Sequence, residues 1–159
     1  MDIVYNLLIV MLFVILIVIL IYRERAKLLK MWKEVSAKEI IFHRLLSESI
    51  KLFYSQKDVL KNEDNRLQFV RLGRNRRKKM RYLHIKERQE LYLALSDLYN
   101  EIEEREDDIC ADLVKLYNRL QKSRRVYNSK VLVYNQRISV FPTRYLAIKM
   151  NLKIKEYFG

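Results

Sequence analysis

The sequence predicts an all-α protein, with an N-terminal single transmembrane helix followed by an antiparallel helical bundle of three long helices plus a short C-terminal helix. The chain has 159 residues but only two glycines and one proline, so it offers few breaks to helices. Residues 3–22 form an almost unbroken apolar run. Beyond this run, apolar residues recur mostly at intervals of three or four, which is typical of amphipathic helices.

The apolar run carries no charged side chain and has the length of a membrane span, since about 20 apolar residues in a helix cross the hydrocarbon core. A cleaved signal peptide is the alternative. It would have a basic start, a shorter apolar core and small residues at its end, whereas here Asp2 precedes the run and Arg23-Glu24-Arg25 follows it. We therefore expect a retained anchor over residues 1–22 and one water-soluble domain over residues 23–159.

The charges on either side of the run predict its orientation. Only Asp2 precedes the run, whereas five basic residues follow it closely: Arg23, Arg25, Lys27, Lys30 and Lys33. Because basic residues stay on the cytoplasmic side, we expect the amino terminus outside the cell membrane and the domain in the cytoplasm. Tyr5 and Tyr22 fall near the two interfaces, where amphipathic rings are favoured.

The formal net charge is +13, and all of the basic residues follow the span. Such a domain is attracted to anionic lipid, to which each lysine or arginine near the surface adds about 1 kcal/mol. It would also bind nucleic acid without sequence preference, but no recognised nucleic-acid module accompanies the charge. We therefore expect a membrane partner and no specific nucleic acid. The single cysteine, Cys110, cannot form an intrachain bridge.

The first soluble helix is predicted from Arg23 to about Leu60, and nothing at residues 22–30 would break its continuity with the span. Trp32 is expected to anchor a core or an interface. The apolar positions that predict this helix are Leu28, Leu29, Trp32, Val35, Ile40, Ile41, Leu45, Leu46, Ile50, Phe53 and Tyr54.

Residues 61–80 are predicted to be a basic connecting segment, because the apolar stripe is lost at 61–65 and Gly73 follows. Residues 71–88 hold nine basic side chains against the single acid Glu87. A solvated loop or helix start, a lipid-headgroup contact and a nucleic-acid contact all remain open for this segment. The candidate lipid contacts are Arg71, Arg74, Arg76, Arg77, Lys78, Lys79 and Arg81.

A second helix is predicted from near Met80 to about Tyr99. Its expected buried face consists of Leu83, Leu91, Ala94, Leu95 and Leu98. The acidic stretch at 101–108 then marks either a tight turn or the acidic first turn of the next helix, where carboxylates are favoured by the helix dipole.

The third helix is predicted over residues 109–141 and contains a seven-residue repeat. Two apolar sets offset by four residues form the narrow seam of a helix packed on other helices. They are Tyr127, Tyr134 and Phe141, and Val131, Ile138 and Tyr145. Asn128 and Asn135 lie beside the seam, where they can cap or hydrogen-bond to a neighbouring helix. Pro142 should end or kink the helix, and a short last helix is expected over 143–158.

This repeat is similar to the LemA family of bacterial membrane-anchored helical proteins. The family pattern reads here Ser123-Arg124, Tyr127-Asn128, Val131, Tyr134-Asn135, Ile138, Phe141-Pro142, Ala147 and Tyr157-Phe158. Trp32 also matches a family residue, but Asn151-Leu152 replaces a usual glycine-phenylalanine and Asn100 a usual proline. Behind Trp32 the family's polar and basic run is absent. The resemblance implies an antiparallel helical bundle on one anchor, and it implies no reaction.

No residue pattern predicts chemistry. His43 and His84 have no partner at metal-ligand spacing, and no Glu-x-x-His pair, phosphate loop or nucleophile elbow is present. We therefore expect no catalytic residue, metal, cofactor or small-molecule substrate. The leading hypothesis is a non-enzymatic scaffold or adaptor that presents the bundle to other proteins or to its own copies. The alternative is an anionic-lipid-binding or membrane-remodelling module acting through residues 71–88, and a helical enzyme with a site between helices is a third.

Overall fold

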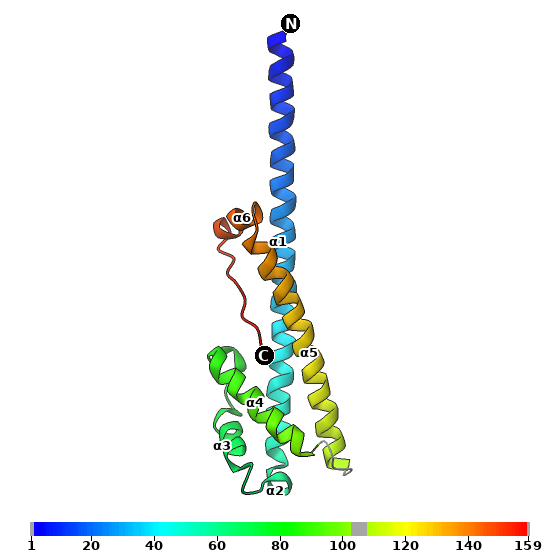
Figure 1. Cartoon of the computed structure of the whole chain (residues 1–159), viewed down its shortest axis with the longest axis vertical. Helices are drawn as coiled ribbons and strands as arrows, with labels where there is room; N and C mark the ends of the chain where they lie inside the picture. Colours follow the sequence, from blue (N-terminus) through cyan, green and yellow to red (C-terminus); the bar gives the residue numbers. More distant parts are fainter. Residues whose placement is uncertain (1, 103–107, 159) are drawn as a thin grey trace. The chain divides into compact units, whose positions relative to one another are not determined.

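The computed structural model describes residues 2–102 and 108–158, and its described part is all-α, as predicted (Figure 1). The count of elements differs from the prediction of three long helices and one short one. The elements are α1 (Asp2–Ser55), α2 (Lys57–Leu60), α3 (Arg66–Asn75), the short 3-10 helix η1 (Met80–Tyr82), α4 (Ile85–Ile102), α5 (Asp108–Ser139) and α6 (Thr143–Lys149).

The chain divides into two compact units. Unit 1 comprises Met1–Val35 and Lys130–Lys155, and unit 2 comprises Ser36–Ser129 and Glu156–Gly159. Helices α1 and α5 each contribute residues to both units. Each unit therefore combines segments that are far apart in the sequence.

Helix α1 is unbroken over 54 residues, which confirms that the first soluble helix continues directly from the apolar run. All side chains from residue 3 to residue 22 are exposed. By length and composition this part of α1 suffices to cross a membrane. The exposure of so many apolar side chains in sequence is consistent with a hydrocarbon surrounding.

In unit 1, α1 and the end of α5 run antiparallel. Glu24 pairs with Arg137 at 2.5 Å, and Glu34 pairs with Lys130 at 3.0 Å, so the residue numbers rise along one helix as they fall along the other. Three members of the predicted seam lie in this part of α5 and are buried: Val131, Tyr134 and Ile138. Leu28 and Val35 of α1 are also buried.

In unit 2, the predicted face of the second helix is confirmed. Leu91, Ala94, Leu95 and Leu98 of α4 are buried, as is Leu83, which lies just before the helix. Phe42 of α1 stacks with Tyr127 of α5 at 6.2 Å, and Tyr99 of α4 stacks with Tyr117 of α5 at 4.1 Å between ring centroids.

The prediction that residues 61–80 form only a connection is wrong, because α3 lies within them. Phe69 and Leu72 of α3 are buried, and their spacing of three places them on one helix face. Gly73 does not break this helix. A Cβ at Gly73 would lie 2.8 Å from the Tyr54 ring, so glycine allows α3 to approach that ring closely. Leu67 and Val70 of the same helix are exposed, so its apolar residues do not mark a single buried face in the sequence.

Helix α5 ends at Ser139, close to where Pro142 predicted a stop, and the seam ends with it. Phe141 and Tyr145 were expected in the seam, but they are 85% and 60% exposed. Residues at heptad spacing lie on one face only within a continuous helix. Because α5 ends at Ser139, the spacing does not place Phe141 and Tyr145 on the face of the seam. The acidic stretch predicted as a turn or a first helical turn falls largely on 103–107, which lie outside the described residues.

The last helix is also shorter than predicted. α6 ends at Lys149, where Asn151 has a left-handed φ of 53°. The amide of Asn151 donates to the Ile148 carbonyl and the amide of Leu152 to the Ala147 carbonyl, which is the Schellman ending of a helix. Asparagine is one of the few residues that adopts this conformation readily, and the family's usual glycine would suit it as well. Residues 152–158, here called the tail, continue without helix.

Candidate functional site

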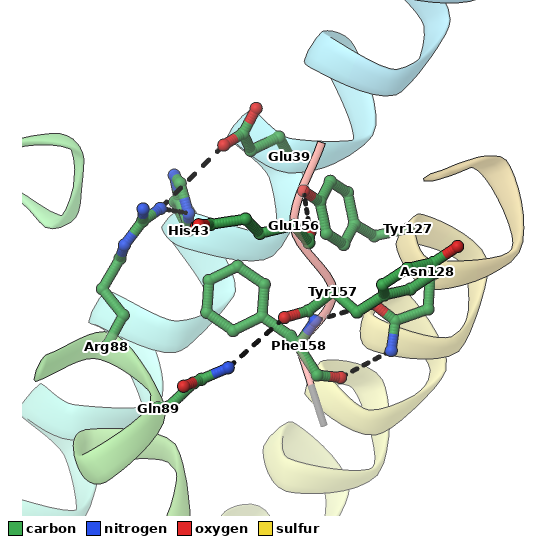
Figure 2. Close-up of polar contacts among 9 residues, drawn as sticks. All are labelled: Glu39, His43, Arg88, Gln89, Tyr127, Asn128, Glu156, Tyr157 and Phe158. Carbon is green, nitrogen blue, oxygen red and sulfur yellow. Dashed lines mark hydrogen bonds and ion pairs between the residues drawn. The ribbon is translucent and has the colours of Figure 1, made fainter. Parts of the chain in front are cut away.

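The repeated Tyr-Asn pairs of α5 bind the backbone of the tail. In unit 2, shown in Figure 2, the Tyr127 hydroxyl donates to the Glu156 carbonyl at 2.8 Å. The Asn128 amide nitrogen donates to the Phe158 carbonyl, and the Phe158 N–H donates to the Asn128 Oδ1 at 3.0 Å. One asparagine thus satisfies both polar groups of one tail residue.

Unit 1 contains a second Tyr-Asn pair that binds the tail in the same way. We call the two pairs clamps: Tyr127 and Asn128 in unit 2, and Tyr134 and Asn135 in unit 1. The Tyr134 hydroxyl donates to the Lys153 carbonyl at 3.0 Å. The Asn135 amide nitrogen donates to the Lys155 carbonyl at 2.8 Å, and the Lys155 N–H donates to Asn135 Oδ1 at 2.9 Å. The expectation that these asparagines serve a neighbouring helix is therefore wrong, since both bind the tail.

The spacing of the clamps has a simple geometric basis. Seven residues of α-helix rise about 10.5 Å, and three residues of extended chain span about 10 Å. The two clamps are seven residues apart on α5, and the tail residues that they bind are three apart: Lys153 and Glu156 for the tyrosines, Lys155 and Phe158 for the asparagines. The heptad of α5 therefore serves tail binding in addition to apolar packing.

The Phe158 side chain packs beside the clamp of unit 2. It is 1% exposed and packs against Phe42 at 4.6 Å, Tyr127 at 5.8 Å and His43 at 5.9 Å between ring centroids. The Arg88 guanidinium lies 5.3 Å from the centre of the Phe158 ring. These distances are those of favourable aromatic and cation–π pairs, so the end of the chain is part of the core.

Several polar side chains of α1 and α4 lie beside this aromatic cluster (Figure 2). Arg88 Nη1 contacts His43 Nε2 at 2.5 Å and lies 3.9 Å from the Glu39 carboxylate. An arginine has only donors, so this contact requires His43 Nε2 to be the acceptor. Gln89 donates to the Tyr157 carbonyl at 3.4 Å. Helix α4 thus makes a polar contact with the tail through Gln89, and α1 contacts the tail through the Phe42 and His43 rings.

Burial raises the pKa of three tyrosines. It raises the pKa of Tyr92 to about 12, with a further contribution from Tyr117 and an opposing one from Arg124. It also raises the pKa of Tyr127, to which Glu39 adds, and the pKa of Tyr134. The phenols at both clamps are therefore neutral donors at physiological pH.

The clamps bind backbone amides and an aromatic ring, and they bring no nucleophile together with a base. Among the described side chains, those of residues 3–102 and 110–158, no group of three or more His, Cys, Asp and Glu could hold a metal ion. Cys110 is buried. The arrangement of the described side chains is suited to holding a peptide segment in place.

A protein-family model described as the LemA family matches residues 85–159. Over these residues the chain belongs to the LemA family. The LemA-family segment contains α4, α5, α6 and the tail, and so it includes both clamps and Arg88. No curated protein and no solved structure matches the chain.

The structure places the residues that carried the LemA resemblance in three ways. Tyr127, Asn128, Tyr134, Asn135 and Phe158 form the clamps. Val131, Ile138 and Ala147 are buried in unit 1, and Arg124 lies over the Tyr92 ring of unit 2 at 5.0 Å. The remaining members are at least 39% exposed or line a cavity described below: Trp32, Phe141, Pro142 and Tyr157.

The basic residues proposed for lipid contact are largely exposed. Arg71, Arg74, Arg77, Lys78, Lys79 and Arg81 are exposed, and Arg76 is half-buried over the Tyr54 ring at 4.4 Å. Lys79 and Arg81 line a groove of about 520 Å³ in unit 2 together with Arg44 and Lys51 of α1. Sequence reasoning missed these two α1 residues because nothing in a linear sequence shows that α1 faces the basic segment.

Substitution of Asn128 tests the clamp of unit 2. Asn128→Asp keeps the acceptor for the Phe158 N–H but places a carboxylate oxygen against the Phe158 carbonyl. We expect a loss of about 1–3 kcal/mol of unfolding free energy, as for a buried polar group left unsatisfied, measured by denaturant unfolding in detergent. The matched control is Asn118→Asp, at an exposed position of the same helix. Equal effects of the two changes would contradict the assigned role.

The raised tyrosine pKa values predict alkaline unfolding. Below about pH 10, the ordinary tyrosine value, the phenols are neutral in both the folded and the unfolded state. Above it they ionise only in the unfolded state, so stability falls as the pH rises. A titration of phenolate absorbance should show some tyrosines ionising together with the loss of helical circular dichroism. Ionisation of every tyrosine near pH 10 with helix retained would contradict this expectation.

Proposed function

We propose that this protein is a membrane-anchored helical scaffold or adaptor without catalytic activity, whose cytoplasmic helices bind other proteins or other copies of the chain. The observation that carries the proposal is the continuity of α1. The apolar run and the buried residues that follow it, from Leu28 to Phe53, belong to one helix without an intervening loop. Anchor and folded part are therefore built from a single element.

The charges around the span support a cytoplasmic location. Five basic residues follow the apolar run within residues 23–33, and the acid Asp2 precedes it. By the positive-inside rule, the proposed topology has the amino terminus outside and the folded part in the cytoplasm, at the cell membrane.

The binding face proposed for a protein partner lies on α1 in unit 1. Trp32 is 39% exposed. Tryptophan is enriched among residues that contribute most to protein interfaces. From the sequence, Trp32 was expected to anchor a core or an interface, and a residue that anchors an interface must be exposed in the free protein.

Photo-crosslinking in intact membranes tests the proposal. A photoreactive amino acid at Trp32 should give adducts of discrete size, either dimers or complexes with one partner. The matched control is the same amino acid at Lys115, an exposed polar position on α5. A monomer without adducts at Trp32, or equal and diffuse adducts at both positions, would argue strongly against a scaffold.

The alternative function is binding or remodelling of anionic membranes through residues 71–88. The groove between α1 and η1 in unit 2 favours it, since Arg44, Lys51, Lys79 and Arg81 contribute four cations and Glu48 one acid. Clustered cations near a bilayer attract anionic headgroups, and salt screens the attraction.

Neutralising the basic segment separates the two functions. Arg76→Gln, Arg77→Gln, Lys78→Gln and Lys79→Gln together should weaken co-sedimentation with phosphatidylglycerol vesicles, by up to about 1 kcal/mol per charge, and leave helicity unchanged because three of the four are exposed. The control removes four exposed cations from α5: Lys115, Arg119, Lys122 and Arg125. Equal weakening by both sets would indicate a net-charge effect. Binding insensitive to salt would rule out the alternative.

A further inference from the structure

The turn after α5 and the helix α6 expose an apolar face in unit 1. Phe141, Tyr145 and Ile148 are 85%, 60% and 68% exposed. Tyr145 and Ile148 are three residues apart in α6 and so lie on one side of it, whereas Thr143 and Ala147 on the other side are buried. Phe141 lies in the turn before this helix. The largest apolar side chains of α6 are thus directed away from the core of their own unit.

A cavity of about 770 Å³ adjoins this face within unit 1. From α1 it is lined by Leu20, Ile21 and Leu29. From the turn and α6 it is lined by Phe141, Tyr145 and Leu146. This lining is apolar, and the volume is that of a site for a small organic molecule or part of a lipid.

The position of the cavity along α1 coincides with the end of the apolar run. A span of about 20 residues rises about 30 Å, the thickness of the hydrocarbon core, so the core ends near residue 22. Leu20 and Ile21 belong to the last turn of that span. The ion pair between Glu24 and Arg137 holds the end of α5 against the residues that follow it. The cavity therefore lies where hydrocarbon meets the lipid headgroups.

Charge at the cavity favours a phosphate. Arg25 and Lys149 both line it, and Arg144 is exposed on α6. Among the described residues that line the cavity, the one acid is Glu24, which pairs with Arg137. Exposed aromatic and aliphatic residues beside lysine and arginine are the composition of helices that lie in a membrane interface.

We propose that the Phe141–Pro142 turn and α6 form a second membrane contact. Phe141, Tyr145 and Ile148 insert into the interface, and the cavity beside α1 takes an acyl chain of a membrane phospholipid whose phosphate is bound by Arg25 and Lys149. The inference rests on the proposed membrane anchor. The site is in unit 1 and is separate in sequence from the basic segment 71–88.

Quenching by lipids with brominated acyl chains tests the insertion. The full chain carrying Trp32→Phe would receive one new indole by Tyr145→Trp, Leu93→Trp or Phe13→Trp, and be reconstituted in phosphatidylglycerol–phosphatidylcholine vesicles. Phe13 lies within the apolar run, and Leu93 is 54% exposed on α4 of unit 2. We expect the Tyr145→Trp and Phe13→Trp proteins to lose most of their fluorescence to bromine, and the Leu93→Trp protein to lose little.

The outcomes separate the inference from the anchor on which it rests. Quenching of the Phe13→Trp protein without quenching of the Tyr145→Trp protein would leave the anchor in place and overturn the second contact. No quenching of the Phe13→Trp protein would overturn both. Equal quenching of the Tyr145→Trp and Leu93→Trp proteins would overturn the assignment of the contact to α6.

A phospholipid with a photoreactive group at the end of its acyl chain tests the cavity in the unmodified protein. Adducts should map to the peptide containing Tyr145 and Leu146 as well as to the span. Leu146→Trp, which fills the cavity, should reduce the α6 adducts several-fold, whereas Val133→Trp, at an exposed position of α5 in the same unit, should not. Adducts confined to the span, or adducts unchanged by Leu146→Trp, would overturn the assigned acyl-chain site.

Discussion

Tyr134→Ala is expected to lower the free energy of unfolding by about 3–5 kcal/mol, the cost of truncating a large buried aromatic residue. Tyr134 has no exposed surface, and its hydroxyl donates to the Lys153 carbonyl at 3.0 Å. The change therefore leaves a cavity in the buried part of unit 1 and removes one hydrogen bond to the tail. Denaturant unfolding of the full chain in detergent, followed by circular dichroism, would measure the loss.

Two further substitutions separate packing from hydrogen bonding at this position. Tyr134→Phe keeps the ring and removes only the hydroxyl, so it should cost about 1 kcal/mol. Val133→Ala changes the adjacent, exposed residue and should stay within about 0.5 kcal/mol. An effect of Tyr134→Ala no larger than that of Val133→Ala would contradict the buried seam.

Phe158→Ala is expected to cost a similar amount, about 3–5 kcal/mol, although it changes the second-last residue of the sequence. Terminal residues usually tolerate change because they are poorly packed. Phe158 differs, since its ring contacts Phe42, Tyr127, His43 and the Arg88 guanidinium. The measurement is the same unfolding experiment.

The adjacent residue provides the control for this prediction. Tyr157 is aromatic and 43% exposed, so Tyr157→Ala should cost much less than Phe158→Ala. Removal of residues 156–159 should be at least as destabilising as Phe158→Ala, because it also removes the partners of Tyr127 and Asn128. A chain that is equally stable with and without these residues would show that the tail is not part of the core.

The fold was predictable where the apolar period is long and regular. The continuity of α1, the buried face of α4 and the seam from Tyr127 to Ile138 all follow from such periods. α3 was missed because only two of its four large apolar residues are buried, so the segment does not show a single buried face in sequence. Phe141 and Tyr145 were misplaced because the heptad was extended past Ser139, where α5 ends.

The candidate site was predictable only in part. The Tyr-Asn repeat was recognisable in sequence, and so was the resemblance of this region to the LemA family, which the family match over residues 85–159 confirms. The partner of the repeat was not recognisable, because hydrogen bonds from Asn128 and Asn135 go to tail carbonyls and amides, and every residue has those groups. The roles of Arg88 and His43 depend on contacts 45 residues apart in sequence.

The sequence by itself determined the apolar run, the excess of basic residues after it, the helical class and the family, because composition and periodicity are properties of the chain alone. Only the tertiary structure decided which segment covers the repeat of α5 and what lines the cavity at the end of the apolar run. Both depend on where the tail and α6 return in space. In unit 1 the tail is bound by Tyr134 and Asn135, and in unit 2 by Tyr127 and Asn128, through backbone groups that no local sequence pattern specifies.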